Sequence, residues 1–537
     1  MTHPLRYLFL EQIRGGLSKR AITRCSQWAE TFRVMGKPFP GPWTFKYHPW
    51  LKEMHDSTSP FLVGMKAAQM GYTECLLNRS FYEIDIHGNN CLYVLPNQKP
   101  DASVFSASRF DPALEASPYL QRLFSDVRNV DHKRAGTANL FVRGARSRSG
   151  LKSIPAAFIA IDELEEMAEH VIPLAKERSS GQLESFLWTI STPFIYNSGI
   201  HELYVTTTQE HFFFPCPTCS KRIELKYPES AVLDTKDPHY ICTECKARLP
   251  EDKEEKAAML SKAEWVPSQP LNQSSGRGFH INQMYSPTIT PAKIKDSFDL
   301  AQTNAADEQE LYNSKLGLPH IPDGAAILDS DIKDCIAGNY RMRTLPSNTA
   351  LVTMGIDVGK LIYYEVTAWL PQGVPVPIDV GHVRDFEDLD ILMYDYRVNY
   401  AVIDANPEFR LAYQFAERFN GHVSLCYYNY SCSGRQITRR ENEDHTITVN
   451  RTSWLDMSLG RFKKKQIVLP LDIPEVYKAQ IKAPVRVMEK TKNGDRMAVY
   501  REGNKADHLA HARNYSEIAM DLGASNMRHG TIYKDVL

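Results

Sequence analysis

Four segments of the chain are almost continuously apolar, which is the pattern of parallel strands buried on both faces of a sheet. They are residues 61–63, 90–96, 157–161 and 185–190. Residues 74–81 predict a helix directly after the first segment, residues 278–282 a strand that returns to the same sheet, and residues 291–316 a long helix. Buried strands that alternate with helices predict an α/β fold for this part of the chain.

The last third of the chain has a different pattern. Its predicted elements are, in order, strands at 351–356, 363–370 and 374–383, a helix at 387–397, a strand at 400–403 and a helix at 507–520. Three consecutive strands, a helix, a fourth strand and one late helix form the ribonuclease-H-like pattern. We therefore expect a second α/β domain here.

Acidic residues follow two of these strands and open the last helix. Asp357 and Asp404 stand at strand ends, and Asp507 starts the helix. Three carboxylates in this order predict a site for two Mg²⁺ ions about 3.5–4 Å apart, which promote in-line attack on a phosphodiester. Each acid taken alone is equally consistent with a cap or a turn. His511 lies one helical turn after Asp507, where it either assists the site or packs as an ordinary helix residue.

A deviant phosphate loop follows the first apolar segment. The template G-x-x-x-x-G-K-[ST] matches at Gly71 and Thr73, whereas Lys66 replaces the first glycine and Tyr72 occupies the lysine position. A lysine at the loop entrance can still reach the β- and γ-phosphates, Gly71 admits them, and the Thr73 hydroxyl can bind Mg²⁺. The alternative is an ordinary strand–turn–helix. The predicted nucleotide-binding residues are Lys66, Ala67, Ala68, Gln69, Met70, Gly71, Tyr72, Thr73 and Asp162.

Two further strand ends carry chemistry suited to ATP hydrolysis. Asp162 and Glu163 end the third apolar segment, where Asp162 would hold Mg²⁺ through water and Glu163 would polarise the attacking water. A solvated acidic helix start is the alternative. Ser191 and Thr192 end the fourth segment and are candidates for coupling hydrolysis to motion.

A basic stretch lies between the loop and the acidic pair. Residues 132–161 contain no acidic residue. The stretch either supplies an arginine finger, in cis or from a neighbouring subunit, or tracks a DNA backbone, or is a solvated loop. Its basic residues are Lys133, Arg134, Arg143, Arg146, Arg148 and Lys152.

Two C-x-x-C pairs, Cys216 with Cys219 and Cys242 with Cys245, are separated by 22 residues. This spacing predicts a structural zinc bound by four thiolates, with four unrelated thiols as the alternative. Farther along, Asn493 and Gly494 predict the turn of a basic hairpin, which is either a DNA clamp or a solvated edge.

Composition limits the class of protein. The chain has 537 residues, a net charge of −1, 43% hydrophobic and 24% charged residues, and ten cysteines. It has no run of about 18 apolar residues and no secretory h-region, so we expect a soluble intracellular protein with no membrane partner. A net charge near zero restricts any nucleic-acid binding to local patches.

Taken together, these motifs resemble those of tailed-phage terminase large subunits of the lambda-like branch. The marks are KAAQMGYT with its displaced Lys66, FIAIDE, STP, the inserted four-cysteine ribbon, YNSKLGLP at 312–319 and DHLAHARNY at 507–515. The resemblance implies an N-terminal ATPase that translocates double-stranded DNA into a procapsid. It also implies a C-terminal endonuclease that cuts concatemeric DNA.

The resemblance also implies cofactors, partners and residue roles. The cofactors would be ATP, Mg²⁺ or Mn²⁺, and Zn²⁺. The partners would be double-stranded DNA, the terminase small subunit and the portal of the procapsid, with a homo-oligomeric ring during packaging. The expected location is the host cytoplasm and transiently the portal, not the virion. Related loops often carry arginine where Gln69 stands, so the finger role would pass to Arg143, Arg146 or Arg148.

The expected domains follow from these motifs. They are a helical and aromatic lead-in at 1–60, a P-loop ATPase at 61–325 with the ribbon inserted at about 208–250, a linker at 326–348, a ribonuclease-H-like nuclease at 349–522 and a tail at 523–537. Two other functions stay open at this point. One is a helicase or repair ATPase fused to a nuclease, and the other is a zinc-ribbon DNA-binding scaffold with degenerate sites.

Overall fold

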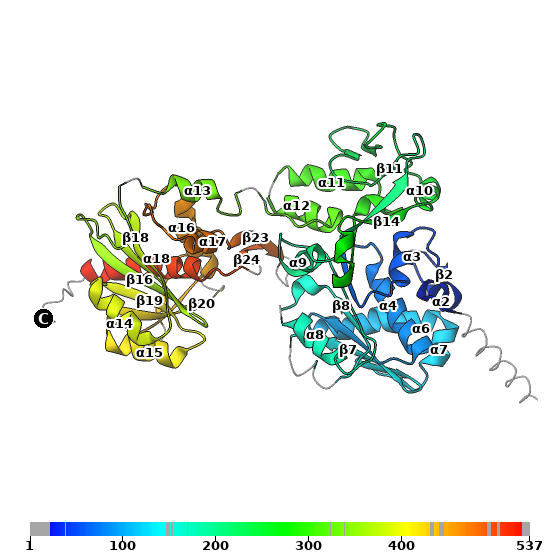
Figure 1. Cartoon of the computed structure of the whole chain (residues 1–537), viewed down its shortest axis with the longest axis horizontal. Coiled ribbons are helices and arrows are strands. Elements are labelled where there is room, and N and C mark those ends of the chain that lie inside the picture. Colours follow the sequence, from blue (N-terminus) through cyan, green and yellow to red (C-terminus); the bar gives the residue numbers. More distant parts are fainter. Residues whose placement is uncertain are drawn as a thin grey trace, which may run out of the picture. The chain divides into compact units, whose positions relative to one another are not determined.

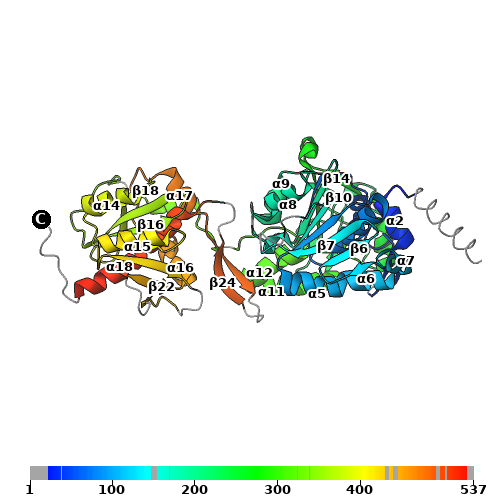
Figure 2. The same cartoon turned by 90° about the horizontal axis from the view of Figure 1, so that it is seen from below.

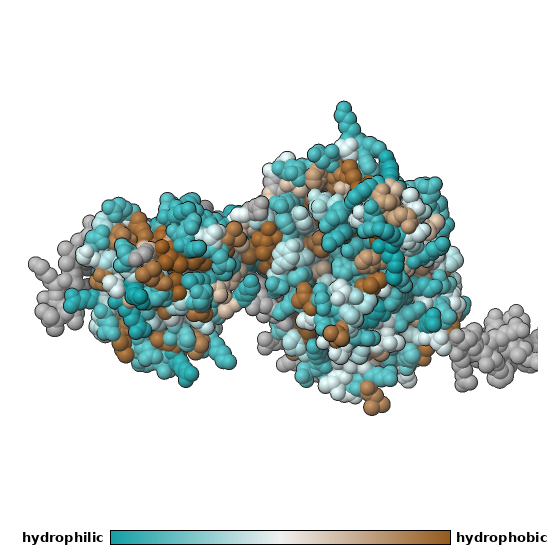
Figure 3. All heavy atoms as spheres, turned by 45° about the horizontal axis from the view of Figure 1, so that its top comes forward, coloured by the Kyte–Doolittle hydropathy of each residue, from teal (hydrophilic) through white to brown (hydrophobic). Residues whose placement is uncertain are grey.

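The chain folds into two compact units, Met1–His320 and Ile321–Leu537, which we describe separately. The computed structural model describes residues 22–37, 39–146, 151, 154–168, 170–303, 305–322, 324–337, 339–429, 434–439, 445–490, 496–501 and 505–528. Among these residues, no helix is both long and apolar enough to span a membrane. On the face shown in Figure 3, hydrophilic side chains cover much of both units, and the second unit also shows an apolar area.

The described part of the first unit contains one large sheet. Its strand order is β11-β10-β15-β3-β9-β8-β4-β7-β6-β5, and β14 pairs with β10. From β10 to β7 neighbouring strands run parallel. The strands are β3 (Phe61–Lys66), β4 (Cys91–Leu95), β5 (Val127–Arg128), β6 (His132–Ala135), β7 (Ala138–Gly144), β8 (Phe158–Asp162), β9 (Phe186–Ser191), β10 (Glu210–Pro215), β11 (Arg222–Ile223), β14 (Glu264–Pro267) and β15 (Arg277–Ile281).

The continuous apolar segments form the centre of this sheet, as predicted. In β3 and β8 neighbouring side chains enter different hydrophobic clusters: Leu62 and Phe158 lie in one, Val63 and Ile159 in the other. Both faces of the sheet are therefore covered, α8 and α9 lying over one and α6 and α7 over the other (Figure 2). Strands in this position need apolar residues at every position, not at alternate ones.

The helices of the first unit connect and cover these strands (Figure 1). They are α2 (Cys25–Phe32), α3 (Trp50–His55), α4 (Tyr72–Tyr82), α5 (Ser103–Phe105), α6 (Asp111–Ala116), α7 (Pro118–Leu123), α8 (Val171–Ser179), α9 (Gly199–Val205), α10 (Lys253–Leu260), α11 (Pro291–Ala301), α12 (Ala305–Glu310) and the π-helical η8 (Leu311–Leu316). The long helix predicted at 291–316 is thus divided among α11, α12 and η8. Two two-stranded pairs complete the unit, β1 (Val34–Met35) with β2 (Gly41–Pro42) and β12 (Ala231–Val232) with β13 (His239–Tyr240).

His55 is a fully buried polar residue in the core of this unit. Its Nδ1 lies 2.7 Å from the carbonyl oxygen of Leu51, and its Nε2 lies 3.0 Å from Nδ2 of Asn78. One neutral tautomer satisfies both partners, because Nδ1 donates and Nε2 accepts. Burial lowers the pKa of His55 to about 4, and the same cause lowers the pKa values of His48 and His280 to about 4.

Acid should therefore destabilise the first unit. These histidines have folded-state pKa values below the ordinary 6.5. Their contribution to the free energy of unfolding is therefore complete above pH 6.5 and is lost as the pH falls towards about 4. At pH 5 each buried histidine should lower the free energy of unfolding by up to roughly 2 kcal/mol. Calorimetric melting at pH 7 and pH 5 should show this loss in the wild-type chain. The loss should be smaller in His55→Asn, and an equal pH slope in the variant would contradict the assignment.

The second unit contains a mixed sheet in the order β18-β17-β16-β19-β20-β22-β21. Strands β16, β17 and β18 form an antiparallel meander, and β16, β19, β20 and β22 run parallel. The strands are β16 (Leu351–Val358), β17 (Ile362–Trp369), β18 (Pro375–Val383), β19 (Tyr400–Asp404), β20 (Val423–Tyr428), β21 (Thr438–Arg439) and β22 (Thr446–Val449). The predicted ribonuclease-H-like fold is confirmed.

One long helix, α18 (His508–Arg528), packs on the centre of this sheet. At Gly355 in β16 an added Cβ would lie only 1.9 Å from the carbonyl oxygen of Ala512, so the close approach of strand and helix requires glycine. The other helices of the unit are α13 (Asp329–Asp334), α14 (Phe386–Asp395), α15 (Phe409–Arg418), α16 (Arg451–Lys463) and α17 (Glu475–Ile481).

Two expected boundaries differ from the structure. Residues 326–348, expected to be a linker, contain α13, and Ile327 and Ile332 are buried in a core cluster of the second unit. The tail expected at 523–537 begins inside α18, because Leu522 and Gly523 are buried and Gly523 packs beside Tyr400. Burial thus extends the helix beyond the point where the apolar pattern weakens.

The basic hairpin is present as an antiparallel pair, β23 (Val485–Lys490) and β24 (Arg496–Arg501). Its predicted turn at 493–494 lies outside the described residues. Arg486 pairs with Asp456 at 2.7 Å, and Arg501 pairs with Glu489. These two cations are thus held by acids within the unit.

Candidate active sites

The phosphate loop connects β3 to α4. Its glycine, Gly71, has φ +82°, and an added Cβ would lie 2.8 Å from Cδ1 of Leu51, so only glycine fits there. The loop is anchored at its base, because the amide of Ala67 donates to the carbonyl of Ile281 and that of Ala68 to the carbonyl of Ser314, both at 2.9 Å. Among the described residues, no backbone carbonyl accepts from the amides of residues 69–71, which leaves them for a ligand.

The side chains of Ala67, Met70 and Tyr72 lie in the hydrophobic core. At Gly64 in β3 an added Cβ would meet the Tyr72 ring at 2.7 Å, which places this ring against the sheet. The residue in the ordinary lysine position therefore faces away from any phosphate. Of the eight predicted loop residues, these three can contribute only backbone groups to nucleotide binding.

Lys66 is directed towards two other predicted site residues. Its Nζ lies 3.4 Å from Oε1 of Glu163 and 3.5 Å from Oγ1 of Thr192. The lysine is buried, whereas the Glu163 side chain is 43% exposed and so can meet solvent. Glu163 adopts a left-handed backbone conformation, with φ 60° and ψ 50°, which is a strained state for a non-glycine residue.

Asp162 is buried at the end of β8. Its Oδ2 accepts a hydrogen bond of 2.7 Å from the Tyr93 hydroxyl, and its buried Oδ1 has no hydrogen-bond partner among the described residues. Burial, with the neighbouring Glu163 charge, raises the pKa of Asp162 to about 6, while Lys66 and the Tyr93 and Thr73 hydroxyls act in the opposite direction. A carboxylate oxygen beside a threonine hydroxyl fits a magnesium ion.

Ser191 ends β9, the strand next to both β3 and β8, and Thr192 follows it directly. The Ser191 hydroxyl donates to the Thr192 carbonyl at 3.2 Å and accepts from the Glu165 amide at 3.1 Å. These contacts join the end of β9 to the segment that follows Glu163. The sheet order therefore brings the predicted nucleotide, base and coupling residues to one edge.

The two arginine-finger candidates that the structure describes, Arg143 and Arg146, lie apart from this group. Arg143 on β7 lies 3.2 Å from Asp131 Oδ2 and donates to the Asp131 carbonyl at 2.7 Å. Arg146 is exposed, and Arg148 lies outside the described residues. In the described structure neither Arg143 nor Arg146 forms an ion pair or hydrogen bond with Asp162 or Glu163.

The four cysteines, Cys216, Cys219, Cys242 and Cys245, come together in one cluster. Their sulfur atoms lie within 4.8 Å of one another, with Cys216–Cys245 and Cys219–Cys242 both at 3.9 Å. Tetrahedral zinc with Zn–S bonds near 2.3 Å separates its ligands by about 3.8 Å, so the thiols fit this ion. The amides of Glu244 and Cys245 both donate to Cys242 Sγ at 3.4 Å, as expected for a thiolate.

In the second unit, Asp357 and Asp404 end adjacent parallel strands, and Asp507 directly precedes α18. Nδ1 of His508 lies 2.8 Å from Asp357 Oδ2, and Nε2 of His511 lies 3.1 Å from Asp507 Oδ2. Burial, opposed by the Asn406 amide and reinforced by the Asp357 charge, raises the pKa of Asp404 to about 6. The three acids therefore share one end of the sheet.

These carboxylates are more widely spaced than the cysteines. Among the described residues, the cysteines form the one set of three or more metal-binding side chains with all ligand atoms within 4.8 Å. A centre with two ions about 3.5–4 Å apart spreads its ligands over a larger distance. The donor set, three oxygens on acids of reduced exposure, fits hard divalent ions.

Sequence reasoning missed two residues of this site, Arg451 and His508. Arg451 on α16 lies 3.1 Å from Nε2 of His511 and 4.0 Å from Asp507 Oδ2. The His508 ring also stacks on Tyr363, with centroids 4.5 Å apart. The adjacency of His508 to Asp507 was a usable signal, whereas only the tertiary fold brings Arg451 here.

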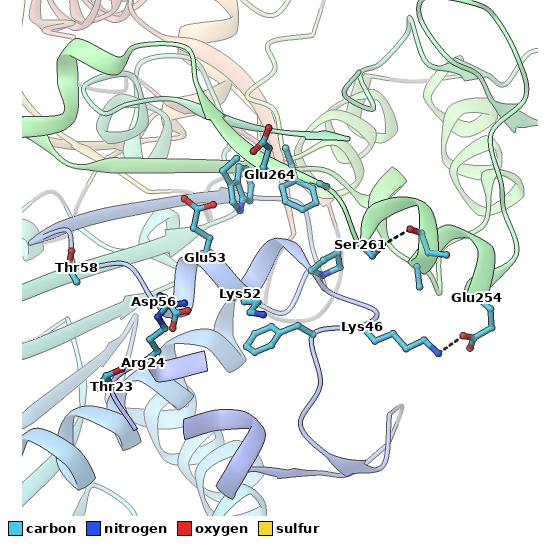
Figure 4. A pocket seen from close by; sticks show the side chains of 17 residues that line it. Thr23, Arg24, Lys46, Lys52, Glu53, Asp56, Thr58, Glu254, Ser261 and Glu264 are labelled. Atoms are coloured by element: carbon cyan, nitrogen blue, oxygen red, sulfur yellow. Dashed lines mark hydrogen bonds and ion pairs between the residues drawn. The ribbon is translucent and has the colours of Figure 1, made fainter. Parts of the chain in front are cut away.

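An open pocket of about 1040 Å³ lies elsewhere in the first unit, between α3 and the α10–β14 segment (Figure 4). None of the predicted site residues lines it. One pair of its charges is neutralised within the pocket, Lys46 by Glu254 at 2.6 Å. We therefore place the chemistry at the strand ends rather than in this pocket.

A parallel sheet with a phosphate loop, followed in the same chain by a ribonuclease-H-like unit, defines a P-loop ATPase fused to a nuclease. Two family models match this chain: "Phage terminase large subunit gpA, ATPase domain" over residues 37–265 and "Terminase large subunit gpA, endonuclease domain" over residues 276–420. The chain belongs to the family of phage terminase large subunits and carries its ATPase and endonuclease domains. The endonuclease match begins in the first structural unit and ends before Asp507.

A solved terminase structure shares the fold. The crystal structure of the HK97 bacteriophage large terminase has a TM-score of 0.54 and 10% identity, covering 93% of this chain and 99% of that chain. A large terminase from a thermophilic bacteriophage matches with a TM-score of 0.33, 12% identity and coverage of 89% and 99%. The complex of that terminase with ADP matches with a TM-score of 0.31 and 12% identity, covering 88% of this chain and 98% of that chain. A comparison with curated protein sequences gives no match.

Proposed function

We propose that this terminase subunit hydrolyses ATP at the edge formed by β3, β8 and β9, and uses the energy to translocate double-stranded DNA into a procapsid. The observation that carries the proposal is the convergence of Lys66 on Glu163 and Thr192. It supports a site in which one buried cation lies between a candidate base and a candidate coupling residue. The two family domains supply the wider context.

Each residue of the ATPase site has a proposed task. Lys66 neutralises the β- and γ-phosphates, while the loop amides up to Thr73 hold the phosphate oxygens. Thr73 and Asp162 would hold Mg²⁺, which neutralises charge on the phosphates when bound. Glu163 accepts a proton from the attacking water as the bond between the γ-phosphorus and the leaving oxygen of ADP breaks. The ion pair between Glu163 and Lys66 weakens when the bound phosphates pair with the lysine instead.

The nuclease site is proposed to cut the concatemeric DNA. Asp357, Asp404 and Asp507 would hold Mg²⁺ or Mn²⁺, which would activate water and stabilise the leaving oxygen. His508 and His511 orient the Asp357 and Asp507 carboxylates through the contacts described above. The guanidinium of Arg451 adds positive charge beside Asp507, suited to a DNA phosphate.

The proposed partners are double-stranded DNA, a terminase small subunit, a portal protein and further copies of this chain in a ring. The proposed location is the host cytoplasm, with transient attachment at the portal. The match to the ATPase family domain supports nucleotide binding. An arginine finger from a neighbouring subunit is also part of the proposal, because Arg143 of this chain is held by Asp131.

A packaging assay tests this function. Purified chain, small subunit and procapsids should protect DNA from added nuclease only when ATP is hydrolysed. Strand separation of a duplex without any protected DNA would instead identify a helicase-type enzyme. DNA binding without DNA-stimulated phosphate release would identify a scaffold with degenerate sites.

We also propose that the four cysteines bind one structural zinc ion. Cys216→Ser should remove zinc and lower the melting temperature of the first unit, because the fold of the knuckles depends on the ion. Elemental analysis of the purified chain should give about one zinc per wild-type chain and far less in the variant. Cys335→Ala is the matched control, since Cys335 lies in the second unit, outside the cluster. Equal zinc in Cys216→Ser would contradict the site.

A further inference from the structure

The four-cysteine insertion shares a hydrophobic core with the phosphate loop. Cys216 and Leu225 of the insertion belong to the same buried cluster as Ala67, Met70 and Tyr72 of the loop. Strands β10 and β11 of the insertion pair with each other, and β10 also pairs with β15 of the large sheet. The insertion is therefore part of the ATPase core rather than a separate appendage.

A first polar link runs from the insertion to the loop through the segment after β15. The buried Gln283 donates from Nε2 to the carbonyl of Ala68 at 2.9 Å. Its neighbours hold the insertion: Asn282 Nδ2 donates to the Leu225 carbonyl at 2.7 Å, and the Tyr285 hydroxyl accepts from the Leu225 amide at 2.8 Å. Both backbone groups of one insertion residue thus bind side chains that flank Gln283.

A second link reaches the same loop residue from the other side. The Ser314 carbonyl in η8 accepts from the Ala68 amide at 2.9 Å. Leu233 of the insertion packs with Leu311 and Leu316 of η8 in one buried cluster. The amide and the carbonyl of Ala68 are therefore both held by segments that pack on the insertion.

The contact between η8 and the loop explains the glycine of the YNSKLGLP motif. Gly317 has φ +63°, and an added Cβ would lie 2.5 Å from the Ala67 nitrogen and 2.8 Å from the Lys66 carbonyl carbon. Only glycine lets η8 end directly against the start of the loop. The motif thus contributes to the loop's support rather than to the sheet.

We propose that Gln283 is a positioning residue of the phosphate loop, and that the folded four-cysteine insertion holds Gln283 and Ser314 in the places from which they fix Ala68. The inference rests on the proposed nucleotide-binding role of residues 66–73. Because the amide and the carbonyl of Ala68 are both held, the amides that follow stay aligned for phosphate. The loop therefore loses less conformational entropy when nucleotide binds.

Gln283→Met in the full-length chain tests the hydrogen bond, because methionine fills the same space without a donor. The dissociation constant of a non-hydrolysed ATP analogue with Mg²⁺, measured by calorimetry, should rise roughly fivefold, as for one lost neutral hydrogen bond. Zinc content and metal-dependent DNA cleavage should equal those of the wild type. An unchanged dissociation constant would overturn the proposal.

Tyr285→Phe tests the insertion's part, since the Tyr285 hydroxyl accepts from the Leu225 amide and donates to the Phe212 carbonyl, and among the described residues it forms no hydrogen bond with the loop. It should also weaken analogue binding, whereas Asn272→Ala should not, although Asn272 likewise donates a side-chain amide to a carbonyl of this unit, that of Thr207. Binding as tight in Tyr285→Phe as in Asn272→Ala would mean that the insertion has no such role.

Reciprocity supplies a second readout. If the insertion supports the loop, bound ATP analogue should slow zinc release to a thiol-reactive agent, followed with a metal-sensitive dye, in the wild type but less in Gln283→Met. The same release rate with and without analogue would overturn the coupling. A wild type that binds no nucleotide at all would instead overturn the proposed ATPase site.

Discussion

Replacing Glu163 by glutamine is expected to lower ATP turnover by a factor of about 10²–10⁴, the usual contribution of a general base. Glutamine keeps the shape of the side chain and removes its ability to take a proton from water. The variant should still bind ATP, because Lys66 and the loop amides are unchanged and Lys66 loses a competing partner at 3.4 Å. Phosphate release in the presence of DNA is the measurement.

A matched control separates this role from a solvated acidic run. Glu166 lies three residues farther on and is exposed, so Glu166→Gln should hydrolyse ATP like the wild type. Endonuclease activity should be equal in all three proteins, because the nuclease acids lie in the other unit. Equal loss in both glutamine variants, or loss of cleavage along with ATP turnover, would refute the assignment of Glu163.

Replacing Asp357 by asparagine is expected to produce the opposite result. Metal-dependent DNA cleavage should fall by at least about a hundredfold, since even the outer partners of metal ligands contribute 10–100-fold. ATP turnover should stay at the wild-type level. Cleavage of plasmid DNA with Mg²⁺ or Mn²⁺, scored over time, measures the first effect, and phosphate release measures the second.

The melting temperature of Asp357→Asn shows whether a loss of cleavage comes from unfolding rather than from the missing carboxylate. Asparagine keeps an oxygen that can accept from His508, and it removes one of the two neighbouring negative charges of Asp357 and Asp404, so the melting temperature of the metal-free chain should not fall. The exposed Glu387 on α14 is the comparison, and Glu387→Gln should cleave DNA normally. Normal cleavage by Asp357→Asn would remove this residue from the site.

The strands and their ends could be predicted from sequence because the signals are local. Continuous apolar runs identify strands buried on both faces, and the residue that follows such a run lies at the ligand-binding edge of an open sheet. This rule finds Asp162 and Ser191, and the phosphate-loop template finds Lys66, without reference to any tertiary contact. The two C-x-x-C pairs are as clear, since metal geometry limits their spacing.

The same local reasoning failed where burial rather than pattern decides. Tyr72 occupies the lysine position of the template, yet its ring packs on Gly64 inside the core. Residues 326–348 look like a linker, but Ile327 and Ile332 are buried. The pairing of the finger candidate Arg143 with Asp131 is likewise a contact that no local pattern records.

By itself, then, the sequence determined the two α/β units, the displaced lysine, the acids at the strand ends and the cysteine cluster, because short-range periodicity and spacing encode them. Only the tertiary structure decided which partners meet: Lys66 with Glu163, Arg451 with His511, and Gln283 with Ala68. Such pairs lie tens to hundreds of residues apart in the chain. Their contact follows from strand order and helix packing, which no local pattern records.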